Sequence, residues 1–252
     1  MTVKTANEIR LMEQACRLAA EALQFTGIQV KAGMTTNELD LIADDFIRRH
    51  GGISACIGYH GYPKSICTSV NEVICHGVPG ARVLREGDII NIDVTAIMHG
   101  FHGDTSAMFF VGEVSEAARK LTECAFEAMH RGIEAVRSGA TTGDIGFAVE
   151  KFVTRKGYVA VREIGGHGIG RVFHEEPFIP SFGKKGKGAR LLKWGTITVE
   201  PMVNETAAPI REKSIPGSEI TEFVTSDGRW SAQYEHTVLI TDEGPRILTI
   251  AS

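Results

Sequence analysis

The stretch NIDVTAIMHGFHGDTS, residues 91–106, predicts two strands joined by a tight turn and places two carboxylates among apolar strand residues. A two-residue turn at 98–99 would set Asp93 directly opposite Asp104, whereas a turn at 99–100 would make them diagonal neighbours. Both turns put the two side chains on one face, because side chains alternate along a strand. Facing carboxylates repel each other, so the pattern predicts either a shared proton or a bound cation.

Three further residues in or next to strand patterns favour the cation. Glu200 ends TITVE, Glu235 lies within SAQYEHTVLI, and glycines surround His167 in GGHGIG. Together with Asp93 and Asp104 they offer four carboxylates and one neutral imidazole, a set that suits two divalent ions about 3.5–4 Å apart. Oxygen-rich ligation with one histidine favours Mn, Fe, Co or Zn. The alternatives are solvent-facing edge acids, an ion pair of Glu235 with a basic residue, and a loop histidine without a role.

An internal repeat relates two halves of the chain. AGMTTNELD at 32–40 matches SGATTGDIG at 138–146, an offset of 106 residues, and DFIRRHG matches KFVTRKG at the same offset. VLREGDIINID echoes LLKWGTITVE, which brings Asp93 into register with Glu200 within one residue of that offset. Two copies are too few for a solenoid. The repeat therefore predicts an α+β protein whose halves are related by a pseudo-twofold axis.

Apolar periodicity predicts four helices. The first covers about 7–25 and the third about 116–137, and the fourth lies within TTGDIGFAVEKFVTRKG. The second begins with a capping box of Thr35 and Glu38, and Gly51 ends it. The least periodic stretch is 201–230, which we expect to be a loop-rich excursion between strands.

The composition is that of an ordinary globular protein, with 43% hydrophobic and 23% charged residues among 252. The formal net charge of −4, without a long basic run, gives no sign of a nucleic-acid surface. Five cysteines without a C-x-x-C pair predict reduced thiols in a cytoplasmic protein. We expect neither a signal peptide nor a membrane span, because the N-terminal helix pattern is charged throughout and no apolar run is long enough.

Five motifs carry a resemblance to a known family: CHGVP, NIDVTAIMHGFHGDTS, GGHGIGRVFHEEP, TVEPM and SAQYEHTVLI. In this order and spacing they resemble the type I methionine aminopeptidases, which belong to the pita-bread metallohydrolases. The resemblance covers essentially the whole chain. It implies a single catalytic peptidase domain, 1–252, in which helices cover a central curved antiparallel sheet. It also implies a monomer that removes the N-terminal methionine of nascent polypeptides, prefers small second residues and associates transiently with ribosomes.

The same resemblance implies two divalent metal ions per chain (Co, Mn, Fe or Zn). Asp93 would be a terminal ligand of one ion, Asp104 and Glu235 would bridge both, and His167 and Glu200 would complete the second. A metal-bridging water, acidified by the two cations, would lose its proton to Glu200 and attack the carbonyl of the first residue.

Two further histidines and an apolar pocket follow from the family pattern. His174 in FHEEP is suited to donate to the developing oxyanion, and His76 in CHGVP can approach the scissile nitrogen. SACIGYHGYPKSIC aligns with the wall of the methionine pocket, where a thioether packs well against aromatic edges. Without the resemblance, the aromatic residues here would be predicted to be core. The implied pocket residues are Cys56, Tyr59, Tyr62, Cys67 and Phe173.

One segment departs from the family pattern. Some relatives carry a Trp soon after EPMVN that closes the methionine pocket, whereas ETAAPIREKSIPGSEITEF has none. We expect Ile220 or Phe223 in that place, because Trp230 lies too near the next strand. The family also suggests a monovalent cation near Asn71, Val73 and Ser231.

Two other functions remain open on the sequence alone. An exopeptidase of the same fold acts on Xaa-Pro bonds, but such relatives usually carry an extra N-terminal domain. A binding protein of this fold would have lost catalysis, although all five candidate ligands and both histidines are present here. Phosphate binding is not indicated, since GGHGIG lacks the G-x-G-x-x-G spacing and GKKGKGA lacks the ending of a P-loop.

Overall fold

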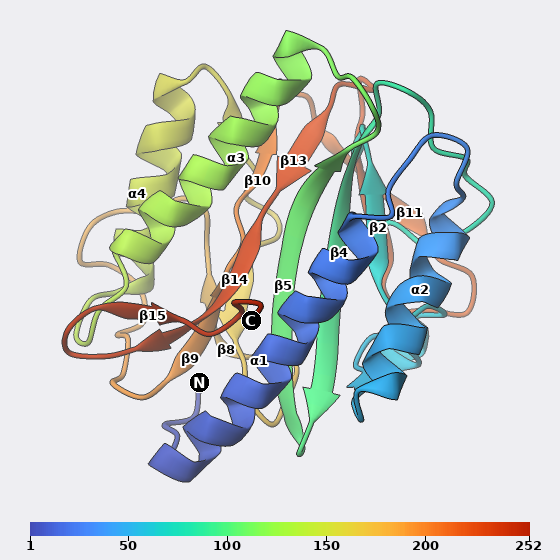
Figure 1. Cartoon of the computed structure of the whole chain (residues 1–252). Helices are drawn as coiled ribbons and strands as arrows, with labels where there is room; N and C mark the ends of the chain where they lie inside the picture. Colours follow the sequence, from blue (N-terminus) through green and yellow to red (C-terminus); the bar gives the residue numbers. More distant parts are fainter.

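The computed structural model describes residues 1–252 and shows four α-helices on one face of a curved antiparallel sheet (Figure 1). The main sheet has nine strands. Two of the nine strands are outside the main strand order: β2 (Cys67–Val70) pairs with β4, and β15 (Pro245–Ile247) pairs with β14. The path itself runs through β1 (Ile53–Ser54), β4 (Ile89–Met98), β5 (Phe101–Phe110), β14 (Glu235–Ile240), β9 (Thr196–Val199), β7 (Gly166–Gly168) and β8 (Glu175–Ile179).

Two three-stranded sheets and a short 3₁₀ turn complete the fold. The first sheet has the order β13 (Ser231–Gln233), β10 (Met202–Asn204), β6 (Val159–Ala160). The second has the order β11 (Ile210–Ser214), β12 (Thr221–Thr225), β3 (Val73–Cys75), and the turn η1 covers Tyr59–Gly61. The segment 201–230, expected to be a loop-rich excursion, contains three short strands joined by loops. These strands, with Pro209 and Pro216 between them, lack the length that makes alternation visible in a sequence.

The helices are close to the predicted ones: α1 (Ala6–Gly27), α2 (Thr36–Arg49), α3 (Glu116–Glu134) and α4 (Thr142–Arg155). The predicted capping box is present, since Thr35 N donates to Glu38 Oε2 at 2.7 Å and Glu38 N donates to Thr35 Oγ1 at 3.2 Å. The third helix ends three residues early, where Val136 N bonds to the carbonyl of Ile133 and tightens the last turn.

The β4–β5 hairpin takes the second of the two predicted registers. Met98 pairs with Phe101, so the turn is His99-Gly100, and both turn residues have positive φ, 54° and 74°. This is the backbone that a two-residue turn needs to match the twist of its strands. Asp104 consequently lies opposite Thr95, and Asp93 is its diagonal neighbour on the same face.

The two halves repeat their backbone contacts, as the sequence repeat predicts. Gly33 N donates to the carbonyl of Leu84 at 2.9 Å, and the equivalent Gly139 N donates to the carbonyl of Leu191 at 3.0 Å. The β-bridges that precede α2 and α4 are equivalent in the same way, Thr35 with Val83 and Thr141 with Arg190. In Figure 1 α1 crosses β5 and β4 with α2 beside it, and α3 and α4 lie on the far side of β14. The predicted pseudo-twofold α+β architecture is confirmed.

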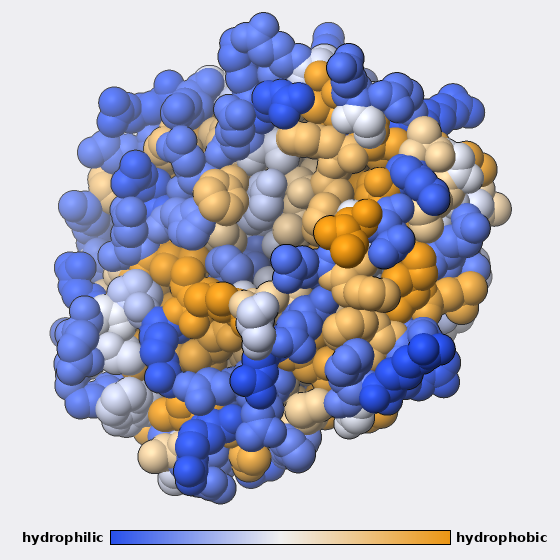
Figure 2. Space-filling view, viewed as in Figure 1, coloured by the Kyte–Doolittle hydropathy of each residue, from blue (hydrophilic) through white to orange (hydrophobic).

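The helical layer supplies most of the core. Fully buried residues of α1, α2 and β4 form one cluster that includes Leu39, Ile47 and Ile92, and α3 and α4 pack around Leu121 and Val153 in another. Figure 2 shows the outer side of this layer, where hydrophilic side chains surround exposed apolar ones. None of the helices has the length and apolar character of a membrane span.

Candidate metal centre and active site

The candidate site lies on the face of the sheet away from the helices. An added Cβ at Gly103 would come within 2.4 Å of Cys16 in α1, so Gly103 faces the helical layer. Side chains alternate along β5, which points the next residue, Asp104, to the opposite face. A cavity of about 270 Å³ opens there and is lined by all twelve predicted site residues: Cys56, Tyr59, Tyr62, Cys67, His76, Asp93, Asp104, His167, Phe173, His174, Glu200 and Glu235.

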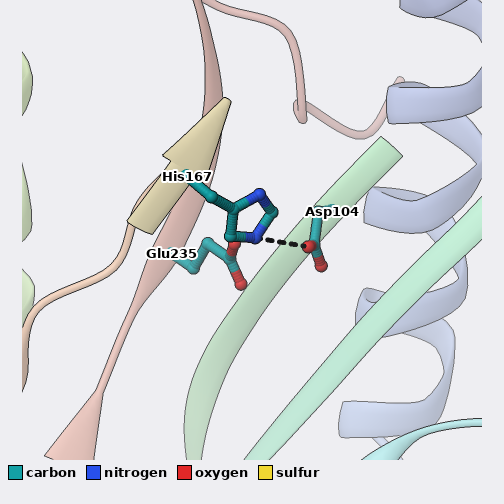
Figure 3. Close-up of side chains that lie close together, drawn as sticks. All are labelled: Asp104, His167 and Glu235. Atoms are coloured by element: carbon teal, nitrogen blue, oxygen red, sulfur yellow. Dashed lines mark ion pairs between the residues drawn. The ribbon is translucent and has the colours of Figure 1, made fainter. Parts of the chain in front are cut away.

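The predicted ligands come together from four strands and one strand end. Figure 3 shows Asp104 from β5, His167 from β7 and Glu235 from β14 pointing toward one another, and their ligand atoms all lie within 4.8 Å of each other. His167 Nε2 is 3.8 Å from Asp104 Oδ2 and 3.6 Å from Glu200 Oε1. Asp93 lines the same cavity from β4. This spacing leaves room for a cation between the oxygen and nitrogen atoms.

Hydrogen bonds orient the ligands from behind. His167 Nδ1 lies 2.9 Å from the carbonyl oxygen of Gly168, so this nitrogen carries the proton and Nε2 presents its lone pair to the carboxylates. Thr95 Oγ1 donates to Asp104 Oδ1 at 2.7 Å, and Thr198 Oγ1 donates to Glu200 Oε1 at 2.7 Å.

The amide of Gln233 is a third such partner, since its Nε2 donates to Glu200 Oε2 at 3.2 Å. Thr95, Thr198 and Gln233 were not predicted as site residues. Their only signal in the sequence is position, because each lies two residues from a ligand within a strand pattern. Gly165, which also lines the cavity, is one of the glycines around His167 that the sequence pattern pointed to, whereas Ile164 gave no signal.

The carboxyl groups are costly to ionise without a counter-ion. Burial first, and repulsion by Asp104 second, raise the pKa of Glu200 to about 8 and hold those of Asp93 and Glu235 well above their usual range. Burial likewise raises the pKa of Asp104 to about 7. Glu235 Oε1 is buried without a hydrogen-bond partner. Divalent cations would satisfy this orphaned oxygen and neutralise the cluster, so the residues present fit a metal centre of oxygen and imidazole ligands.

His76 and His174 flank the predicted metal ligands as neutral rings. His174 Nδ1 is 2.8 Å from the Tyr59 hydroxyl, and burial lowers the pKa of His174 to about 3. His76 Nδ1 is 3.1 Å from the carbonyl oxygen of Thr221, which leaves its Nε2 free, and burial also lowers its pKa. His76 has a φ of 58°, a strained backbone for a non-glycine residue that is often found at functional sites.

An apolar pocket adjoins the metal cluster. Cys56, Tyr62, Cys67 and Phe173 form one buried cluster with Ile215, and the hydroxyl of Tyr62 donates to backbone carbonyls instead of entering the cavity.

Of the two residues that the sequence offered as a lid for the pocket, only Ile220 lines the cavity. Phe223 instead packs edge-on against His76 with ring centroids 5.8 Å apart. Trp230 packs with the cluster of α3 and α4 and does not line the cavity.

The residues suggested for a monovalent cation also lie near one another. Ser231 N donates to the carbonyl of Asn71 at 2.9 Å, and Asn71 has the left-handed φ of 54°. Val73, two residues after Asn71, is the first residue of β3. The buried Ser231 Oγ and the Asn204 Oδ1 from the paired strand β10 have no hydrogen-bond partner.

Known proteins match this chain over nearly its whole length. The model of "Metallopeptidase family M24" matches residues 10–242. "Methionine aminopeptidase A" of Synechocystis sp. is 46% identical, over 99% of this chain and 98% of that protein. "Methionine aminopeptidase" of Escherichia coli strain K12 is 45% identical, over 99% of this chain and 94% of that protein.

Solved structures of similar proteins have the same fold. The methionine aminopeptidase of Rickettsia prowazekii superposes with a TM-score of 0.96 at 42% identity, over 99% of this chain and 100% of that one. An X-Pro aminopeptidase of Thermotoga maritima gives 0.79 at 23% identity over 63% of its own chain, which shows the fold alone. The predicted pita-bread fold and the predicted class of enzyme are confirmed. With its predicted metal ligands gathered in one cavity and residues 10–242 matched by the family model, the chain belongs to metallopeptidase family M24.

Proposed function

We propose that the protein is an exopeptidase that removes the N-terminal methionine of peptides and nascent proteins, with a preference for small second residues. The observation that carries this proposal is the cavity of about 270 Å³ that joins five potential metal ligands, two neutral histidines and an apolar pocket. Relatives of 45–46% identity that are named methionine aminopeptidases support the choice of substrate. We further propose that 1–252 act as one catalytic domain.

Two divalent ions fit the donor set. Asp93 would hold one ion, His167 and Glu200 the other, and Asp104 and Glu235 would bridge them. Such ions, when bound, supply charge stabilisation and an activated water for peptide hydrolysis.

The side chains of this protein supply the proton transfers and the orientation of the substrate. Glu200, whose carboxylate accepts hydrogen bonds from Thr198 and Gln233, would accept a proton from the attacking water. His174 would donate from Nε2 to the oxyanion, and for that role the Tyr59 hydroxyl would donate to its Nδ1. His76, which lines the cavity, would approach the amide nitrogen of the leaving peptide. Both rings stay neutral at physiological pH. His76 donates from Nδ1 to the carbonyl of Thr221, so its Nε2 would accept a hydrogen bond from the substrate N–H.

The apolar pocket would take the methionine side chain. The buried cluster around Cys56, Tyr62, Cys67 and Phe173 offers thiol and aromatic surfaces, against which a thioether packs favourably. Tyr59 and Ile220 would close its open side.

The setting of the enzyme follows from its substrate. Nascent chains are made in the cytoplasm, and five free cysteines suit that reducing compartment. We propose a cytoplasmic monomer that meets nascent chains transiently at the ribosome. The unpartnered oxygens of Ser231 and Asn204, beside Asn71 and Val73, support a monovalent cation that stiffens the β10–β13 pair.

The test is hydrolysis of Met-Ala-Ser by chelator-stripped protein to which Co, Mn, Fe or Zn is returned in parallel. We expect metal-dependent release of free methionine, no cleavage of Xaa-Pro control peptides, and slower cleavage of Met-Leu-Ser. Cleavage of the Xaa-Pro peptides alone would replace the proposed substrate. Binding of two ions per chain without cleavage of any peptide would point to a binding protein.

A further inference from the structure

The connection between β7 and β8 carries two histidines of the site. His167 lies in β7, and His174 ends the connection, directly before Glu175 in β8. Their ring centroids are 4.3 Å apart with the ring planes at 56°. Gly168 pairs with Glu175, so the connection leaves the sheet and returns to it at two paired residues. The relative position of the two rings therefore depends on how residues 169–174 are anchored.

Lys4, far away in the sequence, anchors the start of this connection. Lys4 is only 4% exposed, and its Nζ donates a 2.8 Å hydrogen bond to the carbonyl oxygen of Ile169, two residues after His167. Thr196 Oγ1 donates to the same oxygen at 2.5 Å. The backbone of Lys4 is fixed in turn, because its N–H donates to the carbonyl of Trp194 at 2.9 Å.

The same ammonium group reaches the end of the connection. Lys4 Nζ lies 3.9 Å from Glu175 Oε2, and the Glu175 side chain is 9% exposed. The backbone N–H of Thr2 donates to that oxygen at 2.8 Å. A Cβ added at Gly170 would lie 2.8 Å from Lys4 Nζ and 2.7 Å from Glu175 Oε1. The two charged groups therefore pack against the backbone of Gly170, in space that a larger residue would fill. One buried cation thus spans both ends of the excursion.

We propose that Lys4 and Glu175 are positioning residues that fix His174 relative to His167. Neither lines the cavity, so neither touches the substrate. The inference rests on the proposed role of His174 as oxyanion donor. A donor that shifts by about 1 Å relative to the reacting atoms can lose about 10²-fold in rate, whereas substrate held in the separate apolar pocket keeps its affinity.

Three variants test the pair: Lys4→Met, Glu175→Gln and the double variant. We expect each single change to lower kcat by about tenfold or more with KM within about twofold, because misplacement acts on the reacting centre. The double variant should be no worse than the less active single variant, since both residues belong to one network of contacts around Lys4 Nζ. Arg171→Gln is the matched control, because Arg171 is in the same connection but forms an exposed pair with Glu8. It should keep wild-type rates.

A second readout does not depend on activity. In metal-free protein, the ¹⁵N imidazole signals of His167 and His174 should both shift in Lys4→Met and Glu175→Gln and stay unchanged in Arg171→Gln. If Lys4→Met does not fold, the isosteric Glu175→Gln decides alone. Wild-type kcat and unshifted imidazole signals in a folded variant would overturn the proposal, as would losses that multiply in the double variant. An inactive wild-type protein would contradict only the proposed function, and the imidazole signals would then decide the positioning role.

Discussion

Thr95 donates a 2.7 Å hydrogen bond from Oγ1 to Oδ1 of Asp104, the residue directly opposite it in the β4–β5 hairpin. The bond occupies one carboxylate oxygen and leaves Oδ2 facing His167, 3.8 Å away. The orientation of the proposed bridging ligand is therefore set by its cross-strand partner.

Replacing Thr95 by Val keeps the shape of the side chain and removes this donor. We expect divalent metal affinity or activity to fall about 10–100-fold, the usual cost of losing a partner of a metal ligand. Titration calorimetry of metal-free protein with Mn or Co measures the affinity. The control is Thr154→Val on the exposed face of α4. Equal affinity of Thr95→Val and the control would contradict the role of the hydroxyl.

The stability that the buried carboxylates contribute to the metal-free protein should decrease as the pH rises. Burial raises the pKa of Asp104 from 3.8 to about 7 and that of Glu200 from 4.5 to about 8. Between these limits these two groups bind more protons in the folded state than in the unfolded chain, so their contribution is fully present below about pH 4 and is lost by about pH 8.

Urea unfolding at pH 5, 6, 7 and 8 with a chelator measures this slope. Bound divalent ions stabilise the ionised carboxylates, so added Mn should stabilise the protein most at pH 8 and least at pH 5. A stability that is independent of pH without metal would show that the carboxylates ionise without cost.

His174→Ala should lower kcat by about 10²–10³-fold, the usual effect of removing one oxyanion donor. Because His174 is proposed as a donor and not as a ligand, the variant should still bind two metal ions per chain. Steady-state rates and metal analysis of the same sample separate these roles. Loss of metal with loss of rate would instead assign His174 to the metal centre.

Ile220→Ala should widen the proposed methionine pocket. A few lost methylene contacts are worth about 10-fold in kcat/KM, so discrimination between Met-Ala-Ser and Phe-Ala-Ser should shrink by about that factor. Competition between the two peptides in one reaction measures the ratio directly. Trp230→Phe, outside the cavity, should leave the ratio unchanged. An unchanged ratio in Ile220→Ala would show that Ile220 does not contact the side chain of the first residue.

The sequence determined what depends on local periodicity and local hydrogen bonding. Alternation along 91–106 placed Asp93 and Asp104 on one face whichever turn formed, and the Thr35 and Glu38 pair marked the start of a helix from four residues of chain. The 106-residue repeat also predicted equivalent backbone hydrogen bonds in the two halves, because the helices and strands of each half pack in the same way.

Only the tertiary structure decided contacts between residues far apart in the chain. The hairpin register depended on whether His99 accepts a positive φ, and Ile220 was separated from Phe223 by the pairing of β12 with β3. The bonds of Lys4 to the β7–β8 connection left no trace in any local pattern. The free energy of such contacts is gained only after the strands have paired. The sequence could therefore predict which residues gather at the site, while the fold determined how each one is held.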